Sequence, residues 1–238
     1  MSRLEIFGID GIGEIVPGDD LAAIIHNAAG AGSDTALADG DVVVVTQKIV
    51  SKAEDRLVAI DPEDPLSHKP LVERESVRIL RRRGELIISE TEHGFVCANA
   101  GIDLSNVKMG WAALLPVDPD RSARRIRDRL RHRFGVDVAV IISDTFGRTW
   151  RRGVTDVAIG CAGVAGILDL RGTPDALGRE MQVTEVALVD ELAAAAELVM
   201  GKSTNTPVAV VRGADRTWLR DGSVSDEIIR RPEDDLFR

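Results

Sequence analysis

The chain has 238 residues, a formal net charge of −9 and 44% hydrophobic residues, which fits a globular protein and argues against a general nucleic-acid binder. It has no apolar run near the roughly 18 residues that a membrane-spanning helix needs, and acidic residues interrupt its first 15 residues where a signal peptide would be apolar. Its two cysteines, Cys97 and Cys161, are too few for a disulfide framework, so we expect a reducing, cytoplasmic location.

The first third of the chain predicts a short strand, a helix and a buried strand. Residues 3–8 have the pattern of the short strand. The helix is expected to begin near Asp19 and to end at Gly30, because aspartate and glycine are common residues at the two ends of helices. Residues 42–46 are mostly valine, which favours a strand that is buried on both faces.

The middle third predicts two helices separated by a hairpin. A helix is expected over residues 71–83, followed by two strands that turn at His93–Gly94. The second helix carries seven arginines between Arg121 and Arg133 and one apolar stripe, with Asp120 and Gly135 as its expected end residues. Its basic face is either solvated or directed at phosphate or RNA, and the sequence leaves both interpretations open.

The last third predicts a strand at 136–142, a small-residue strand and turn, a helix at about 183–200 that stops at Gly201, and a final strand. Strands and helices do not alternate regularly, which favours an α+β fold, with mixed sheets and packed helices, over a doubly wound sheet. We predict one domain over residues 1–238, with a tail from about residue 216 that is loosely attached.

One stretch, VIISDTFGRTWRRG at residues 140–153, places polar groups directly after a β-branched run. Asp144 and Thr145 are expected at the carboxyl end of this strand, and three arginines follow them, at positions 148, 151 and 152. The simple interpretation is a turn and a solvated basic loop. The functional interpretation is an oxygen-ligand site for Mg²⁺ that faces phosphate-binding arginines.

A second stretch, CANAGIDLSN at residues 97–106, brings Asp103, Ser105 and Asn106 close together in sequence. An Asx turn or a helix cap explains this pattern without any ligand. Alternatively, Asp103 is a second carboxylate ligand and Asn106 contacts a nucleotide. If the fold joins Asp103 to Asp144, the two carboxylates can share cations that neutralise phosphate charge.

Two further stretches offer groups for phosphate. Lys48 and Lys52 follow the valine strand beside Gln47; such lysines are usually solvated, but they also suit contact with phosphate oxygens. The glycines of GIDGIGE, within residues 8–14, form a simple loop or allow backbone N–H groups to approach an anion. The MGKST at 200–204 is not a P-loop, because Ala196 replaces the required glycine and a helix precedes it.

Six segments in their order resemble the coenzyme F420-0:L-glutamate ligase family: GIGEIVPGDDL, DVVVVTQKIVSKAE, CANAGIDLSNV, IISDTFGRTWRRGVTDVAIG, GREMQVTEVALVDELAAAAELVMGKS and TPVAVVRG. The resemblance covers about residues 3–215. It implies a mixed α+β fold in an intertwined homodimer. It also implies a GTP-dependent ligase that adds L-glutamate, repeatedly and later through γ-linkages, to coenzyme F420-0 by way of an acyl phosphate, releasing GDP and phosphate. Mg²⁺ or Mn²⁺, together with K⁺, are the cofactors that the family implies.

The resemblance also assigns residues. It matches Asp103, Asp144 and Thr145 to metal-binding positions, the two aspartates being the expected catalytic residues. It matches these residues to nucleotide-contacting positions: Gly11, Ile12, Gly13, Glu14, Gln47, Lys48, Lys52, Asn106, Met200, Gly201, Lys202, Ser203, Thr204, Asn205, Thr206 and Pro207. The expected partners are GTP, L-glutamate and F420-0, without membrane or nucleic acid. Two alternatives stay open: a metal-dependent phosphohydrolase, and a noncatalytic module that binds phospholigands or RNA.

Overall fold

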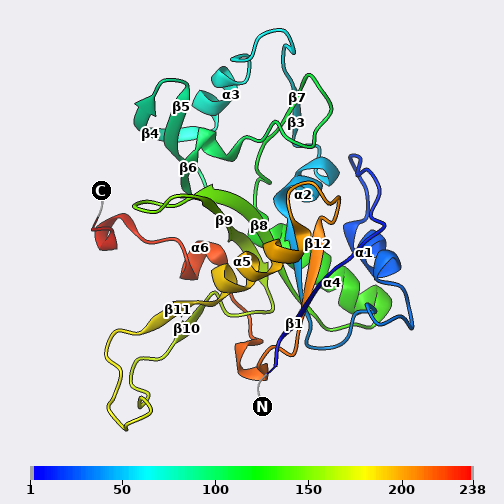
Figure 1. The fold of residues 1–238 in the computed structure, drawn as a ribbon, viewed down its shortest axis with the longest axis vertical. Helices are drawn as coiled ribbons and strands as arrows, with labels where there is room; N and C mark the ends of the chain where they lie inside the picture. Colours follow the sequence, from blue (N-terminus) through cyan, green and yellow to red (C-terminus); the bar gives the residue numbers. More distant parts are fainter. Residues whose placement is uncertain (1–2, 237–238) are drawn as a thin grey trace.

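A mixed five-stranded sheet forms the centre of the computed structural model, which describes residues 3–236 (Figure 1). Only β2 and β8 run parallel within this sheet; the other neighbouring strands are antiparallel. The α+β prediction is therefore confirmed. In spatial order the strands are β1 (Glu5–Gly8), β12 (Val208–Arg212), β2 (Val42–Thr46), β8 (Ala139–Gly147) and β9 (Val154–Ala162).

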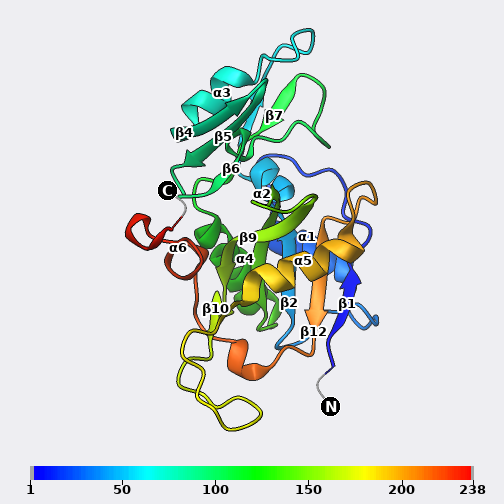
Figure 2. The ribbon, with the colours of Figure 1, turned by 60° about the vertical axis from the view of Figure 1, so that its left-hand side comes forward.

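Helices cover both faces of the central sheet. Figure 2 shows α5 (Leu188–Met200) in front of the sheet, with α1 (Leu21–Ala29) and α4 (Pro119–Phe134) behind it. This coverage explains why Val42 to Val45 of β2 are all completely buried, and it confirms the strand predicted at 42–46.

The helix ends follow the capping rules: α1 and α4 start one or two residues away from the predicted positions and end at the predicted glycines. The Asp20 carboxylate, not that of Asp19, accepts the Ala23 N–H at the start of α1, and Gly30 ends this helix as predicted. Helix α4 starts at the cap residue Asp118 instead of Asp120. Its end at Gly135, which adopts the left-handed backbone conformation, is as predicted.

The helix predicted at 71–83 is wrong over most of its length. Helix α3 covers only Lys69–Arg74, and the arginine-rich segment after it is strand β4 (Ser76–Arg83). β4 pairs with β5 (Leu86–Thr91) across the turn at Gly84, and β5 pairs with β6 (Val96–Ala98) across the turn predicted at 93–94. Cross-strand pairing therefore overrides the helix propensity of arginine and leucine in this segment.

Short elements connect this three-stranded sheet to the rest of the molecule. The upper part of Figure 1 contains α3, the β4–β5–β6 sheet and the pair of strands β3 (Leu57–Ala59) and β7 (Trp111–Ala113). The 3-10 turn η1 (Asn99–Gly101) follows β6, and helix α2 (Gln47–Ala53) follows β2.

The C-terminal part holds several short elements. Strands β10 (Ile167–Asp169) and β11 (Glu185–Ala187) pair and carry a protruding segment between them, so the helix predicted from 183 begins only at Leu188. Beyond β12 lie η2 (Arg216–Trp218), α6 (Val224–Glu227) and η3 (Pro232–Asp234). The Val224 side chain is completely buried. Among the helices of residues 3–236, none has both the length and the apolar character that a bilayer crossing requires.

Candidate functional site

The candidate site lies where the parallel pairing of β2 and β8 ends, at Thr46 and Ser143. β2 leads directly into α2, whereas β8 continues as a hairpin with β9 after an irregularity between Ile142 and Ser143. The strand predicted at 136–142 therefore extends further, to Gly147. Asp144 and Thr145 lie within β8 and beyond its pairing with β2, so their side chains project from the hairpin at this edge of the sheet.

Lys48 and Asp103 meet at this edge. The Lys48 ammonium lies 2.7 Å from Asp103 Oδ2 and donates to the Ser105 hydroxyl at 2.9 Å. The Ser105 N–H donates to Asp103 Oδ1 at 2.7 Å, so the predicted Asx turn is present as well. Burial of Asp103 raises its pKa, but the hydrogen bonds from Lys48 and Ser105 outweigh burial and hold the pKa below its usual value.

Asp144 is within electrostatic reach of Asp103. Burial is the largest cause that raises the pKa of Asp144, to about 7, and the negative charges of Asp103 and Asp156 raise it further; the Thr145 N–H and Lys48 act in the opposite direction. Asp103 and Asp156 therefore both act electrostatically on Asp144. A carboxyl group that resists ionisation, as that of Asp144 does, is frequent at functional sites.

Asp156 is the site residue that sequence reasoning missed. It is the direct cross-strand partner of Thr145 and only 3% exposed. Its Oδ1 accepts the Thr145 hydroxyl at 2.7 Å, and its Oδ2 accepts the Ser143 hydroxyl at 3.1 Å. The signal was a lone aspartate inside the otherwise apolar strand VTDVAIGCA, because a buried charge there requires specific partners.

The segment 200–207 adds a cation to the three carboxylates. The Lys202 ammonium donates to Thr145 Oγ1 at 2.6 Å and to Asp156 Oδ1 at 2.8 Å. Burial lowers the pKa of Lys202, but Asp156 and Glu197 together raise it above its usual value. The Asn106 amide donates to the Lys202 carbonyl at 3.4 Å, which connects two of the stretches predicted to contact nucleotide.

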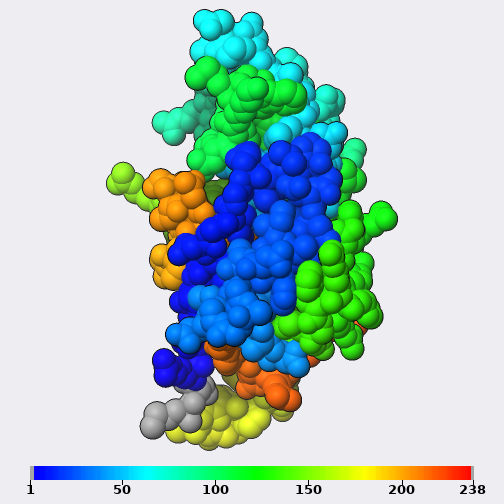
Figure 3. Space-filling model, turned by 90° about the vertical axis from the view of Figure 1, so that its right-hand side faces the viewer, coloured from blue at the N-terminus to red at the C-terminus, as the bar shows by residue number. Residues whose placement is uncertain are grey.

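The same segment also touches the glycine-containing loop near the N-terminus. The Thr206 hydroxyl donates to Asp10 Oδ1 at 3.1 Å, and Figure 3 shows the orange segment beside the dark blue one on this face. Lys52, which is 6% exposed, lies 2.5 Å from the Glu14 carboxylate. Hydrogen bonds and ion pairs thus link the predicted segments 103–106, 144–145 and 200–207 with Lys48, and they link Lys52 with Glu14. Asp10, which was not predicted, links the segment 200–207 to the loop that precedes Gly11.

Three of the predicted nucleotide-contacting side chains are turned inward. Gln47 is 2% exposed, and its amide nitrogen donates to the Leu114 carbonyl at 3.1 Å and to the Ser51 hydroxyl. Ile12 and Met200 are also buried, within the hydrophobic core. The contacts of these side chains therefore hold the surrounding loops in place.

The arginines at 148, 151 and 152 lie at the exposed tip of the β8–β9 hairpin. The Arg148 guanidinium donates to the Arg152 carbonyl at 3.3 Å, and the Trp150 side chain beside it is 87% exposed. The tip thus offers cationic and aromatic surface.

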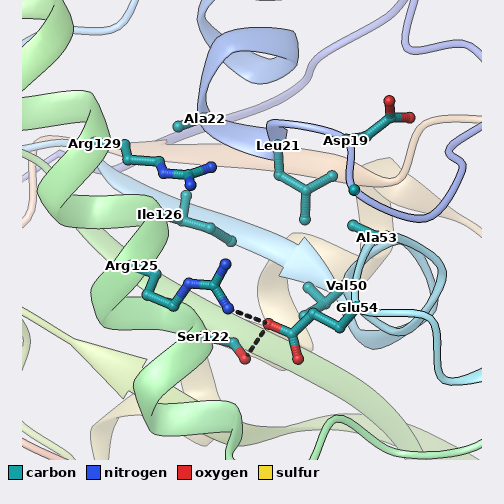
Figure 4. Close-up of a pocket in the computed structure, with 11 residues that line it drawn as sticks. Asp19, Leu21, Ala22, Val50, Ala53, Glu54, Ser122, Arg125, Ile126 and Arg129 are labelled. Carbon is teal, nitrogen blue, oxygen red and sulfur yellow. Dashed lines mark hydrogen bonds and ion pairs between the residues drawn. The ribbon is translucent and has the colours of Figure 1, made fainter.

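The basic helix α4 lies away from this site and is largely neutralised. Five of its arginines pair with acidic residues, among them Arg129 and Arg133 with Asp20, at 3.1 and 2.9 Å. Figure 4 shows a pocket of about 90 Å³ between α1, α2 and α4, where Arg125 and the Ser122 hydroxyl hold the Glu54 carboxylate. None of the predicted site residues lines this pocket.

The carboxylate and hydroxyl oxygens of the site are of the ligand type that Mg²⁺ and Mn²⁺ prefer. Within residues 3–236, no three acidic, histidine or cysteine side chains converge closely enough to enclose a metal ion. Mg²⁺ commonly binds proteins through only one or two carboxylates and completes its octahedron with water and substrate phosphates. Asp103 and Asp144 provide such a pair.

The chain matches known proteins over almost its whole length. Residues 11–213 match the model of the family described as F420-0:Gamma-glutamyl ligase. A protein of Methanothermobacter thermautotrophicus named coenzyme F420:L-glutamate ligase is 42% identical, over 99% of both chains. Proteins of the same name from Methanopyrus kandleri and Methanococcus maripaludis are 45% and 41% identical, over 94% and 85% of this chain and 94% and 86% of their own.

Proposed function

Since the chain belongs to the F420-0:gamma-glutamyl ligase family, we propose that it joins L-glutamate to coenzyme F420-0 and uses GTP to drive the reaction. The observation that carries this proposal is the convergence of Asp103, Asp144, Lys48 and Lys202 from four separate segments of the chain. Such a mixture of carboxylates and ammonium groups suits the handling of a polyphosphate and its cation.

The reaction that we propose has two steps. A carboxylate oxygen of F420-0 attacks the γ-phosphorus of GTP, the bond to the β–γ bridging oxygen breaks, and GDP leaves. The amine nitrogen of glutamate then attacks the carbonyl carbon of the acyl phosphate, inorganic phosphate leaves, and the nitrogen loses a proton to solvent. In later rounds, the γ-carboxylate of the last glutamate takes the place of the first carboxylate.

The residues of the site would act mainly by positioning and by charge neutralisation. Lys48 and Lys202 would donate to phosphate oxygens, and the backbone N–H groups of residues 11–13 would approach the anion. Asp103 and Asp144 would hold Mg²⁺ or Mn²⁺, which supplies charge neutralisation at the phosphates when bound. The arginines of the β8–β9 tip are suited to the anionic groups of F420-0. K⁺ is a further cofactor in this proposal, without a residue assigned to it.

The proposal is tested by incubating the pure protein with GTP, Mg²⁺, L-glutamate and F420-0. The expected products are GDP, phosphate and an F420 species heavier by one glutamyl unit per turnover. Reactions that lack glutamate or F420-0 are the controls. Phosphate release that persists without these two substrates, with no glutamyl product, would instead indicate the phosphohydrolase.

We also propose that the protein works as a homodimer. The segment between β10 and β11 protrudes from the molecule (Figure 1). It exposes apolar side chains, with Leu177 95% and Val183 84% exposed. A second copy that covers this segment would remove apolar surface from water. Sedimentation equilibrium is expected to give twice the chain mass; the mass of a single chain would refute the dimer.

A further inference from the structure

The Lys202 ammonium occupies a position at which three oxygen atoms converge. It donates to Thr145 Oγ1 and to Asp156 Oδ1, and it lies 3.3 Å from Glu197 Oε1. An ammonium group has three N–H donors, so these three oxygens use all of them. The contact to Glu197 is the longest of the three, and it is therefore the contact that a phosphate oxygen would replace most easily.

Asp156 is fully occupied by its present partners. Its carboxylate is buried and accepts from Thr145, Ser143 and Lys202. The Thr145 hydroxyl gives its only hydrogen to Asp156 and accepts from Lys202. A buried carboxylate requires a compensating positive charge, and Lys202 supplies it.

These contacts leave no place for a divalent cation at Thr145. An ion bound to the Thr145 hydroxyl would lie next to the Lys202 ammonium, and the two positive charges would repel each other strongly in this partly buried region. Asp103 and Asp144, in contrast, have no contact with Lys202, and their common partner is Lys48. On one side of the site, the Lys202 ammonium thus already lies between Asp156 and Thr145. On the other side lie the carboxylates of Asp103 and Asp144.

We propose that Lys202 is a built-in cation of this site, which replaces a metal ion between Asp156 and Thr145 and binds a phosphate oxygen of the nucleotide. This inference rests on the proposed function and refines it: the divalent cation binds on the Asp103–Asp144 side, and Thr145 is not one of its ligands. About half of the Lys202 side chain is exposed, so phosphate can reach its ammonium from solvent.

The segment that carries Lys202 is anchored on both sides, which fixes the ammonium in place. The Lys202 carbonyl accepts from Asn106, the Thr204 hydroxyl donates to the Met200 carbonyl, and Thr206 donates to Asp10. Gly201 ends α5 with φ of 60°, a conformation that favours glycine and turns the chain toward β8. A tethered cation held in this way loses little freedom when phosphate binds.

The test is to count the Mn²⁺ ions that bind per chain, by electron paramagnetic resonance of free Mn²⁺, in the intact protein and in Lys202→Gln. The substitution removes the ammonium and adds a carbonyl oxygen beside Asp156. Lys202→Gln is therefore expected to bind one Mn²⁺ per chain more than the wild type. Equal numbers of bound ions in the two proteins would overturn the proposal.

Two variants are the controls. Lys202→Arg keeps a cation between Asp156 and Thr145, so it is expected to bind as many Mn²⁺ ions as the wild type. Arg179→Gln removes an exposed positive charge from the segment between β10 and β11, and it is also expected to leave the ion count unchanged. A gain of one ion in Arg179→Gln would attribute the effect to net charge, and a gain in Lys202→Arg would show that a cation at this position does not exclude the ion. Either result would overturn the proposal.

The affinity for a nonhydrolysable GTP analogue in EDTA gives a second readout. Lys202→Gln is expected to weaken this affinity by about tenfold relative to Lys202→Arg, the loss that one charge-assisted hydrogen bond produces. Equal affinities would overturn phosphate binding by Lys202. Ligase turnover is assayed on the same samples: if no glutamyl product forms while Lys202→Gln still gains its ion, the proposed function fails and the built-in cation stands.

Discussion

Lys48 and Asp103 form an ion pair with a distance of 2.7 Å between Lys48 Nζ and Asp103 Oδ2, although they come from separate parts of the fold. Lys48 lies in α2, directly after a strand of the central sheet, whereas Asp103 follows the three-stranded sheet and η1. The Lys48 side chain is 16% and the Asp103 side chain 32% exposed. The pair thus joins the two sheets at the candidate site and keeps Asp103 ionised.

Asp103→Asn is expected to lower kcat of the proposed ligase by about 10²-fold or more, because the site loses a fixed negative charge where phosphate and its cation are positioned. The amide is isosteric and still accepts from Ser105, so the melting temperature is expected to change little. Steady-state kinetics and thermal unfolding are measured together. Asp169→Asn, which removes an exposed carboxylate from β10, is the matched control. Full activity of Asp103→Asn would remove Asp103 from the site.

Asp144→Asn is expected to stabilise the protein in EDTA above neutral pH. Burial raises the pKa of Asp144 to about 7, whereas an aspartate in the unfolded chain titrates near 4. The protonated carboxyl therefore stabilises the folded state at low pH, and this contribution is lost as the pH rises through about 7. The amide has no such penalty.

The measurement is the melting temperature of both proteins in EDTA between pH 5 and pH 8. The difference in favour of Asp144→Asn should grow by at least about 1 kcal/mol, or about 2–4 °C, over this range. Saturating Mg²⁺ should then stabilise the wild type more than the variant. A temperature difference that stays constant from pH 5 to pH 8 would show that the carboxyl of Asp144 does not resist ionisation.

The sequence predicts the central sheet well because its signals are local. Val42 to Val45 and the final strand are buried β-branched runs, and Gly30, Gly135 and Gly201 end helices through their own backbone freedom. The same reasoning failed at 71–83, where pairing of β4 with β5 decides the structure. The partner strand β5 begins only after the predicted helix would end, so the pattern within residues 71–83 does not reveal the pairing.

In the candidate site, too, some residues can be predicted from local sequence signals and one cannot. The end of a predicted strand points to Asp144 and a polar run after CANAGI points to Asp103, and the structure brings the two within electrostatic reach of each other. Asp156 was missed because its partners, Thr145 and Lys202, become neighbours only when β8 turns back as β9 and the segment after α5 reaches the hairpin. A buried acid inside a strand predicts that partners exist, but not which residues they are.

Asp120→Ala is expected to destabilise the protein and to loosen the segment around α6. The Asp120 carboxylate is 7% exposed and accepts three backbone N–H groups, from Cys161 at 2.8 Å, Val224 at 2.9 Å and Ser225 at 3.0 Å. Alanine leaves these donors without partners, which costs about 2 kcal/mol or more.

Chemical denaturation and hydrogen exchange check this prediction. The amides of Val224 and Ser225 are expected to exchange much faster in Asp120→Ala, whereas those of Val43 and Val44 in β2 follow the global stability. Asp118→Ala, which removes only the N-cap of α4, is the comparison and should leave exchange at Val224 unchanged. Unchanged protection of Val224 in Asp120→Ala would mean that its burial, rather than Asp120, holds this segment.

Gly160→Ala is expected to be among the most destabilising single-methyl changes in the sheet. A Cβ at Gly160 would lie 2.3 Å from the Pro119 carbonyl carbon, 2.5 Å from its oxygen and 2.7 Å from the Asp120 nitrogen, all backbone atoms at the start of α4. Because backbone atoms cannot rotate away, α4 and β9 must separate, at a cost of about 1–3 kcal/mol or more.

The measurement is urea denaturation of the purified variant, with the midpoint and slope compared with wild type. Gly147→Ala in β8, where a Cβ meets no atom within 4 Å, is the control and should unfold like the wild type. Equal midpoints for Gly160→Ala and Gly147→Ala would mean that α4 is not seated on β9 at this contact.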